Sequence, residues 1–127
     1  MIAVADTSPI CYLILIGEID LLPKIFSQVL APQAVLAELL HEDAPAAVRG
    51  WASNLPSWIC VKDLPLLATS GLEKLQAGEQ AAILLAESTK ADIILLDEKA
   101  ARRVAAARAR LQLVDWLNWR PLSTASG

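Results

Sequence analysis

The sequence predicts an α/β fold in which a central parallel sheet is covered by helices on both faces. Short apolar runs bounded by turn-forming or charged residues indicate strands at 2–5, 26–31, 58–61, 92–97 and, less extensively, 111–114. Helical patterns separate these runs, and regular alternation of strands and helices is typical of parallel sheets. The apolar fraction of 55% exceeds the usual ~45–50%, as expected for helices buried on both faces of a sheet.

Length and hydropathy indicate one domain without a membrane segment. A chain of 127 residues fits a single domain, so we expect one domain over 1–127. The longest apolar run, 10–16, is shorter than the ~18 residues needed to cross a bilayer. Asp6 interrupts the apolar N-terminal run and no basic segment precedes that run, unlike a signal peptide. We therefore expect a cytoplasmic protein.

Helix signals follow the first two strands. Ser8 and Pro9 predict a helix over 9–16, with Ser8 as its N-cap, and Gly17 is a natural stop. A short helical turn is expected at 21–22. Pro32 then opens a helix that runs to about residue 40. The apolar stripe expected on that helix consists of Val35, Leu36, Leu39 and Leu40.

The second half of the chain continues the alternation. A short helix is expected at 44–52, a loop at 64–70 and one helical turn at 72–75. Gly78 precedes an almost wholly apolar helix at 79–88, and a helix that is apolar on nearly every side is normally buried. A last helix is expected at 98–110.

Four acidic residues lie where this fold can bring them to one edge of the sheet. Asp6 and Asp97 each end a buried strand, Glu79 begins a buried helix, and Glu38 lies in the helix opened by Pro32. Ligands of α/β sheets bind beyond the carboxyl ends of the strands. Singly, each acid has a structural explanation as a turn residue, a solvated side chain, a favourable charge at a helix start or a helix cap.

Together the four carboxylates predict a metal site. Each would raise the pKa of its neighbours, and a divalent cation removes that cost. Carboxylate oxygens favour Mg²⁺ or Mn²⁺. Such a site can lower the pKa of a bound water and orient it for attack on a phosphodiester. Thr7 or Ser8 can donate a hydrogen bond to Asp6, to the water or to the phosphate, although Ser8 already has a structural role as the expected N-cap.

The charge is unevenly distributed along the chain. Residues 1–97 carry 5 basic and 12 acidic side chains, whereas residues 98–127 carry 6 basic and 2 acidic side chains. Four of those basic residues share one face of the last helix, either against a nucleic-acid backbone or as an ordinary solvated face. They are Lys99, Arg102, Arg103 and Arg110. His41, the only histidine, is best explained as a surface side chain, and it supports no Ser/His/Asp triad.

Four segments resemble the PIN-domain ribonuclease family, in particular its VapC-like branch. They are V-A-D-T-S-P-I at 4–10, A-P-Q-A-V-L-A-E-L at 31–39, G-E-Q-A-A-I-L-L-A at 78–86 and I-L-L-D-E-K-A-A-R-R-V-A at 94–105. The first and last are fairly specific, and the middle two are weak alone. The resemblance covers about 1–110. The tail from about 111 departs from the family pattern, which usually continues with a glycine-containing turn and a further helix, so an atypical short C-terminal tail is expected.

The resemblance implies a three-layer α/β/α sandwich and endonucleolytic cleavage of RNA. By motif, the acids that hold Mg²⁺ or Mn²⁺ and act in catalysis would be Asp6, Glu38, Glu79 and Asp97. Many VapC-like relatives are toxins neutralised by a small antitoxin protein, and many are homodimers, so these partners are expected as well.

Two other functions remain open at this point. A catalytically inactive PIN-like module could bind RNA or a protein without cutting. A phospho-receiver domain is the less favoured alternative, because Asp6 has no acidic neighbour and the run 58–61 leads to no clear phospho-acceptor. A dinucleotide-binding domain would need a G-x-G-x-x-G motif, which the sequence lacks.

Overall fold

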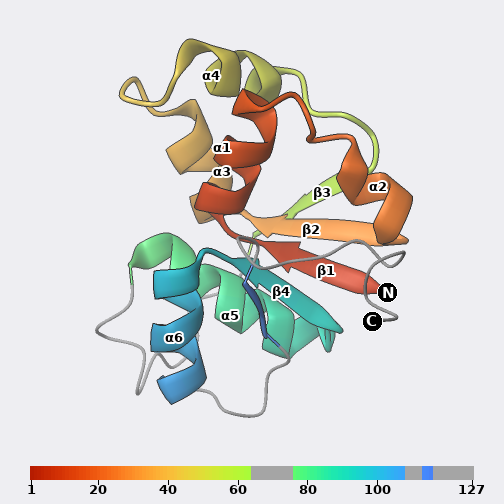
Figure 1. Cartoon of the computed structure of the whole chain (residues 1–127), viewed down its shortest axis with the longest axis vertical. Helices are drawn as coiled ribbons and strands as arrows, with labels where there is room; N and C mark the ends of the chain where they lie inside the picture. Colours follow the sequence, from red (N-terminus) through yellow and green to blue (C-terminus); the bar gives the residue numbers. More distant parts are fainter. Residues whose placement is uncertain (64–75, 108–112, 116–127) are drawn as a thin grey trace.

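Strands and helices alternate along the chain as expected (Figure 1). The computed structural model describes residues 1–63, 76–107 and 113–115. Its elements are, in order, β1 (Ile2–Ala5), α1 (Thr7–Leu15), α2 (Leu21–Ile25), β2 (Gln28–Pro32), α3 (Gln33–Leu40), α4 (Ala46–Ser53), β3 (Ile59–Lys62), α5 (Ala77–Thr89), β4 (Ile93–Leu96), α6 (Glu98–Ala107) and β5 (Leu113–Asp115).

The strands form one parallel sheet in the order β3-β2-β1-β4-β5. From β1 the chain adds β2 and β3 on one side, then crosses to add β4 and β5 on the other. The order therefore reverses between β1 and β4, where Ala5 lies opposite Leu95. Ligands of such sheets bind at this reversal, beyond the carboxyl ends of the strands.

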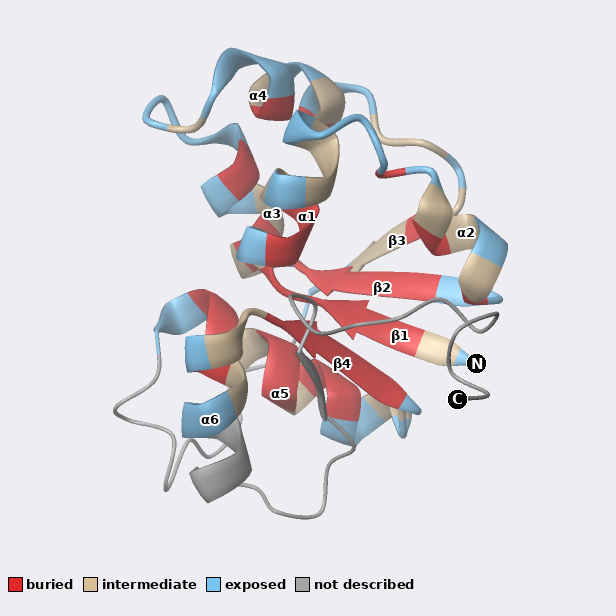
Figure 2. Ribbon diagram, viewed as in Figure 1, coloured by how far each residue is buried: buried red, intermediate tan, exposed pale blue. Residues whose placement is uncertain are grey.

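Helices cover both faces of the sheet, which confirms the predicted three-layer α/β/α fold. Figure 1 shows α1 to α4 over one face and α5 and α6 over the other. The core is accordingly divided in two. In β1, Ala3 and Ala5 pack into the first half and Val4 into the second, because successive side chains of a strand point to opposite faces. Strands β1, β2 and β4 are largely buried, whereas β3 at the edge of the sheet is mostly half-buried (Figure 2).

The ends of α1 show one prediction that is wrong and one that is confirmed. The helix starts at Thr7, with Asp6 rather than Ser8 as its N-cap residue. At the other end Gly17 has a φ of 76°, and the backbone N–H groups of Glu18 and Gly17 donate to the carbonyls of Leu13 and Ile14. This is a Schellman motif, which needs a left-handed residue and so accounts for the glycine.

Two other details differ from expectation. Helix α5 begins two residues early, at Ala77, so that Gly78 lies inside its first turn and is buried. In α3, Val35 and Leu39 are buried, but Leu40 is 43% exposed and does not belong to the buried stripe. The buried stripe of α3 is therefore narrower than the apolar stripe that its sequence predicts.

Several expectations fall on parts of the chain that the structure does not describe. The loop at 64–70, the turn at 72–75, Arg110 and the tail from 116 onward all lie outside the described residues. None of the described helices is both long enough and apolar enough to cross a membrane.

Candidate active site

The reversal of strand order brings Asp6 and Asp97 to the same edge of the sheet. They follow β1 and β4, which are adjacent and parallel. The backbone N–H of Asp6 donates to the carbonyl of Leu95 at 3.1 Å, so the sheet pairing extends to the residue that carries the first acid. Both acids also begin helices, because α1 follows Asp6 and α6 follows Asp97.

Asp6 is a buried carboxyl group with a strongly shifted pKa. It is 5% exposed and lies at the N-cap position of α1. Its pKa is raised from 3.8 to about 7, chiefly by burial and then by the charges of Glu79, Glu38 and Asp97, against a hydrogen bond from the Thr7 backbone that lowers it. The other three predicted acids therefore act on Asp6 electrostatically.

Glu38 reaches the same place from α3 and is held there by Thr7. The Thr7 hydroxyl donates to Glu38 Oε2 at 2.5 Å. A Cβ atom added at Gly78 would lie 2.9 Å from Glu38 Oε1 and 3.2 Å from Asp6 Oδ1. The two carboxylates thus converge on the first turn of α5, and a glycine at this position gives them room.

Glu79 is buried beside them but is bound to an arginine. It is 4% exposed, and its Oε1 accepts the backbone N–H of Gln76 at 3.3 Å in a capping box at the start of α5. Arg103 in α6 donates through Nε to Oε1 at 3.3 Å and through Nη2 to Oε2 at 2.5 Å. The predicted structural explanation for Glu79, a favourable charge at a helix start, is therefore present together with an ion pair.

Sequence reasoning placed Arg103 on a substrate-binding face and missed its pairing with Glu79. The two residues are 24 positions apart in sequence, and only the packing of α6 beside α5 brings them together. No local pattern could indicate this pair. In the structure Arg103 is the partner of a predicted metal ligand, with its side chain 40% exposed.

Asp97 acts as a helix cap. Its Oδ1 accepts the backbone N–H of Ala100 at 2.8 Å, which satisfies one of the free donors at the start of α6. Asp97 is half-buried. The structural role that the sequence allowed for Asp97 is therefore present.

The donor chemistry fits a hard divalent cation, but the acids are bonded within the chain. Among the described residues, no three His, Cys, Asp or Glu side chains lie close enough together to hold a metal ion as they stand. Glu38 is bonded to Thr7, Glu79 to Arg103 and Asp97 to its own helix. A cation would have to replace some of these bonds. The pKa of Asp6 is raised chiefly by burial and further by the charges of the other three acids, and a bound cation would offset that repulsion.

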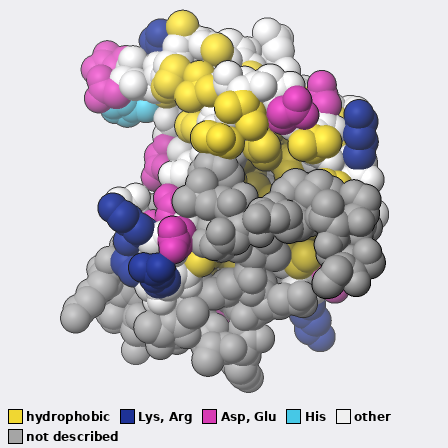
Figure 3. All heavy atoms as spheres, in the orientation of Figure 1, with side chains coloured by type: hydrophobic (Ala, Val, Ile, Leu, Met, Phe, Trp, Pro, Cys, Tyr) yellow, Lys and Arg dark blue, Asp and Glu magenta, His cyan; other side chains and the backbone are white. Residues whose placement is uncertain are grey.

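Basic side chains border the acids on α6. Figure 3 shows Lys and Arg side chains over this helix, next to acidic side chains. Lys99, Arg102 and Arg103 are exposed, and Arg102 forms an i, i+4 ion pair with Glu98 at 2.6 Å. Among the side chains that the structure describes, Lys99 has no ion-pair partner, which leaves it open to solvent or to a ligand.

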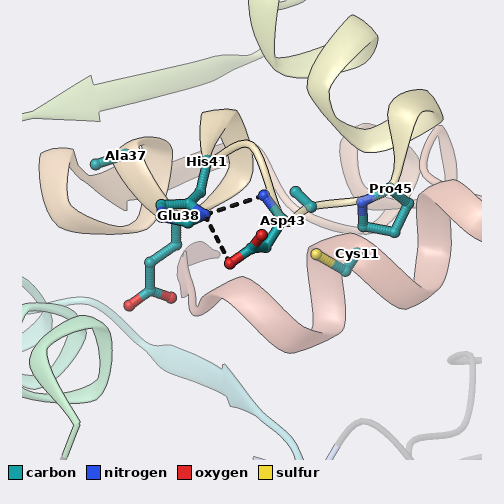
Figure 4. Close-up of a pocket in the computed structure, with 7 residues that line it drawn as sticks. Cys11, Ala37, Glu38, His41, Asp43 and Pro45 are labelled. Atoms are coloured by element: carbon teal, nitrogen blue, oxygen red, sulfur yellow. Dashed lines mark hydrogen bonds and ion pairs between the residues drawn. The ribbon is translucent and has the colours of Figure 1, made fainter.

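A groove of about 440 Å³ opens beside Glu38, between α1, α3 and the start of α4 (Figure 4). Its apolar lining includes Cys11, Ala44 and Pro45. His41 lies at its edge, is exposed, and accepts the backbone N–H of Asp43 at Nδ1 over 3.0 Å. The groove gives Glu38 access from solvent, and His41 is placed as a surface side chain.

The strand order excludes the phospho-receiver alternative. Receiver domains have the order 2-1-3-4-5, whereas the order here is β3-β2-β1-β4-β5. In the receiver arrangement the first and third strands are neighbours; here β1 lies between β2 and β4.

A family model described as a PIN domain matches residues 2–114, a range that includes all four acids. No curated protein and no solved structure matches the chain significantly.

Proposed function

The chain belongs to the PIN-domain family, and we propose that it is a divalent-metal-dependent endoribonuclease. Membership of the family indicates nuclease activity in general. The finer proposal specifies RNA as the substrate, Mg²⁺ or Mn²⁺ as the cofactor, and the acids at the β1–β4 edge as the groups that bind it.

One observation carries this proposal: the carboxylates of Asp6 and Glu38 converge on Gly78 at the strand-order reversal. An added Cβ there would lie 3.2 Å from one carboxylate and 2.9 Å from the other. A structural turn or cap does not need two carboxylates on one glycine. Their repulsion contributes to the raised pKa of Asp6, and a cation between them would relieve it.

We assign a role to each side chain. Asp6, Glu38, Glu79 and Asp97 would hold the metal ion, which when bound supplies an acidified water and offsets charge on the phosphate. Thr7 orients Glu38 through its hydroxyl. Ser8 is exposed at the start of α1 and Lys99 at the start of α6, so both can contact the RNA backbone. Arg102 and Arg103 form ion pairs with carboxylates of the chain. Each could contact the RNA backbone only if it shared or broke its ion pair.

The test is cleavage of a labelled single-stranded RNA by the purified protein. We expect products with Mn²⁺ or Mg²⁺, none with EDTA, and at least a ~100-fold lower rate for Asp6→Asn. Asp20→Asn is the matched control, because Asp20 is exposed beside α2 and lies outside the site. Equal rates for Asp6→Asn and the wild type would refute the assignment.

We extend the proposal to a toxin of the VapC-like type, paired with a small antitoxin and active as a homodimer. The motifs that resemble this branch support the extension. Expression of the wild type in a bacterial host should arrest growth, and expression of Asp6→Asn should not. Arrest by both proteins would separate toxicity from nuclease chemistry.

An inactive PIN-like module that binds RNA or a protein is the second candidate. The observation that favours it is that Glu79 and Arg103 neutralise each other, since a site with fewer free carboxylates needs a cation less. This alternative predicts RNA binding without cleavage, unaffected by EDTA.

A further inference from the structure

We propose that Arg103 is an internal counter-ion of the acidic site, so that a divalent cation must compete with it for Glu79. The inference rests on the proposed metal site and adds its regulation: the chain itself supplies a cation that lowers the site's metal affinity. The ion pair between a buried acid and the adjacent helix is the observation behind it.

The bonds to Glu79 leave little capacity for a metal ion. Oε1 accepts two donors, one from Gln76 and one from Arg103, and Oε2 accepts a second donor from Arg103. Two-point binding of a carboxylate by a guanidinium is among the stronger charge-assisted contacts in proteins. A cation that takes Glu79 as a ligand must displace at least one of these donors.

The two partners are buried to different degrees, and this decides which one moves. The Glu79 side chain is 5% exposed and anchored in the first turn of α5, whereas the Arg103 side chain is 40% exposed on α6. Arg103 can therefore turn toward solvent while Glu79 stays in the site. The released guanidinium would then lie at the edge of the site, where an RNA phosphate is a suitable new partner.

Arg103 also lowers the site's negative charge while it is paired. The hydrogen bond to Glu79, followed by the charges of Glu79, Asp97 and Asp6, raises the pKa of Arg103, so the guanidinium experiences the field of three of the four acids. By the same interaction, removing this positive charge strengthens the attraction of the acids for a divalent cation. The gain in Mn²⁺ affinity should be about tenfold or more, since a unit charge and a divalent cation a few ångströms apart near a protein surface repel each other by more than about 1 kcal/mol.

The experiment measures Mn²⁺ affinity by titration calorimetry without RNA. We expect Arg103→Gln to bind Mn²⁺ about tenfold more tightly than the wild type. Arg102→Gln removes an equal charge from the neighbouring residue, whose partner is Glu98, and should change the affinity less than about twofold. Arg103→Lys, which keeps the charge but loses the fork geometry, should lie between wild type and Arg103→Gln.

Equal or weaker Mn²⁺ binding by Arg103→Gln would overturn the inference. It would indicate instead that Arg103 holds Glu79 in the position needed for metal binding. A measurement on the wild type covers the case in which Arg103→Gln fails to fold. Addition of Mg²⁺ should shift the NMR signal of the Arg103 Nε–H, assigned by its loss in Arg103→Lys, toward that of a solvated guanidinium. An unchanged signal under saturating Mg²⁺ also overturns the inference.

These outcomes are distinct from failure of the proposed function. If the wild type binds Mn²⁺ through Asp6 and cleaves RNA while Arg103→Gln binds no tighter, only the counter-ion role fails. If Arg103→Gln binds more tightly and no variant cleaves RNA, only the nuclease proposal fails.

Discussion

Asp6 is ionised at a cost to the folded state. Its pKa rises from 3.8 to about 7 on folding, so between these pH values the folded protein keeps a proton that the unfolded chain has lost. The free energy of unfolding of the metal-free protein must therefore fall as the pH rises through this window. The loss is on the order of 4 kcal/mol, and it is complete above the folded pKa.

Replacement of Asp6 by Asn isolates this effect, because an amide does not ionise. In EDTA, urea denaturation should show Asp6→Asn to be several kcal/mol more stable than the wild type at pH 8. The two proteins should approach each other as the pH falls below 3.8, where Asp6 becomes protonated in the unfolded chain as well as in the folded protein. Curves that run parallel from pH 4 to pH 8 would show that Asp6 is not buried in the way described.

Thr7 is expected to matter for the position of Glu38 rather than for the fold. Thr7→Val removes the hydroxyl that donates to Glu38 Oε2 but keeps the shape of the side chain. Since Glu38 is exposed, we expect the free energy of unfolding to change by less than about 1 kcal/mol and the RNA-cleavage rate to fall about tenfold. Thr7→Ser keeps the hydroxyl and should retain most of the rate; loss of the rate in both variants would point to a steric role.

At the scale of an element, the first turn of α5 is shaped by the site rather than by helix propensity. Alanine is favoured over glycine inside a helix by about 1 kcal/mol. Gly50 in α4 has no atom within 4 Å of an added Cβ, so Gly50→Ala should raise Tm. In Gly78→Ala the new Cβ would lie 2.9 Å from Glu38 Oε1, the movable end of a long side chain.

We expect Gly78→Ala to fold and to lose metal affinity. The Glu38 carboxylate would be displaced, and calorimetry should show Mn²⁺ binding weakened about tenfold or more, since one ligand is misplaced. Gly50→Ala is the matched control and should bind Mn²⁺ as the wild type does. Unchanged affinity in Gly78→Ala would mean that Glu38 does not bind the metal ion.

The elements differ in how far their sequences determine them. The apolar run of β4 and the Gly17 stop of α1 carry strong local signals, and both predictions are confirmed. The start of α1 was misplaced because Ser8-Pro9 and Asp6 are both acceptable helix starts locally, and pairing of β1 with β4 favours the earlier one. The Glu79–Arg103 pair depends on packing between helices, which no sequence period encodes.

In the whole molecule, the four acids come from all three layers. Asp6 and Asp97 follow strands of the sheet, Glu38 belongs to α3 on one face and Glu79 to α5 on the other. The sequence could predict a shared edge for the two strand-end acids, because parallel strands align their carboxyl ends. It could not predict that the strand order would reverse between β1 and β4 and make those two strands neighbours.

A ligand held by all three layers can bind only the folded chain, so metal binding should stabilise the whole molecule. At a free Mn²⁺ concentration of 100 times its Kd the gain is about 2.7 kcal/mol, which for a chain of this length raises Tm by roughly 8 °C. Calorimetric scans should show this rise for the wild type and none for Asp6→Asn. An equal rise in Tm for both proteins would show that Mn²⁺ binds at another site, because Asp6 is the buried acid whose pKa is raised by all three of the other acids.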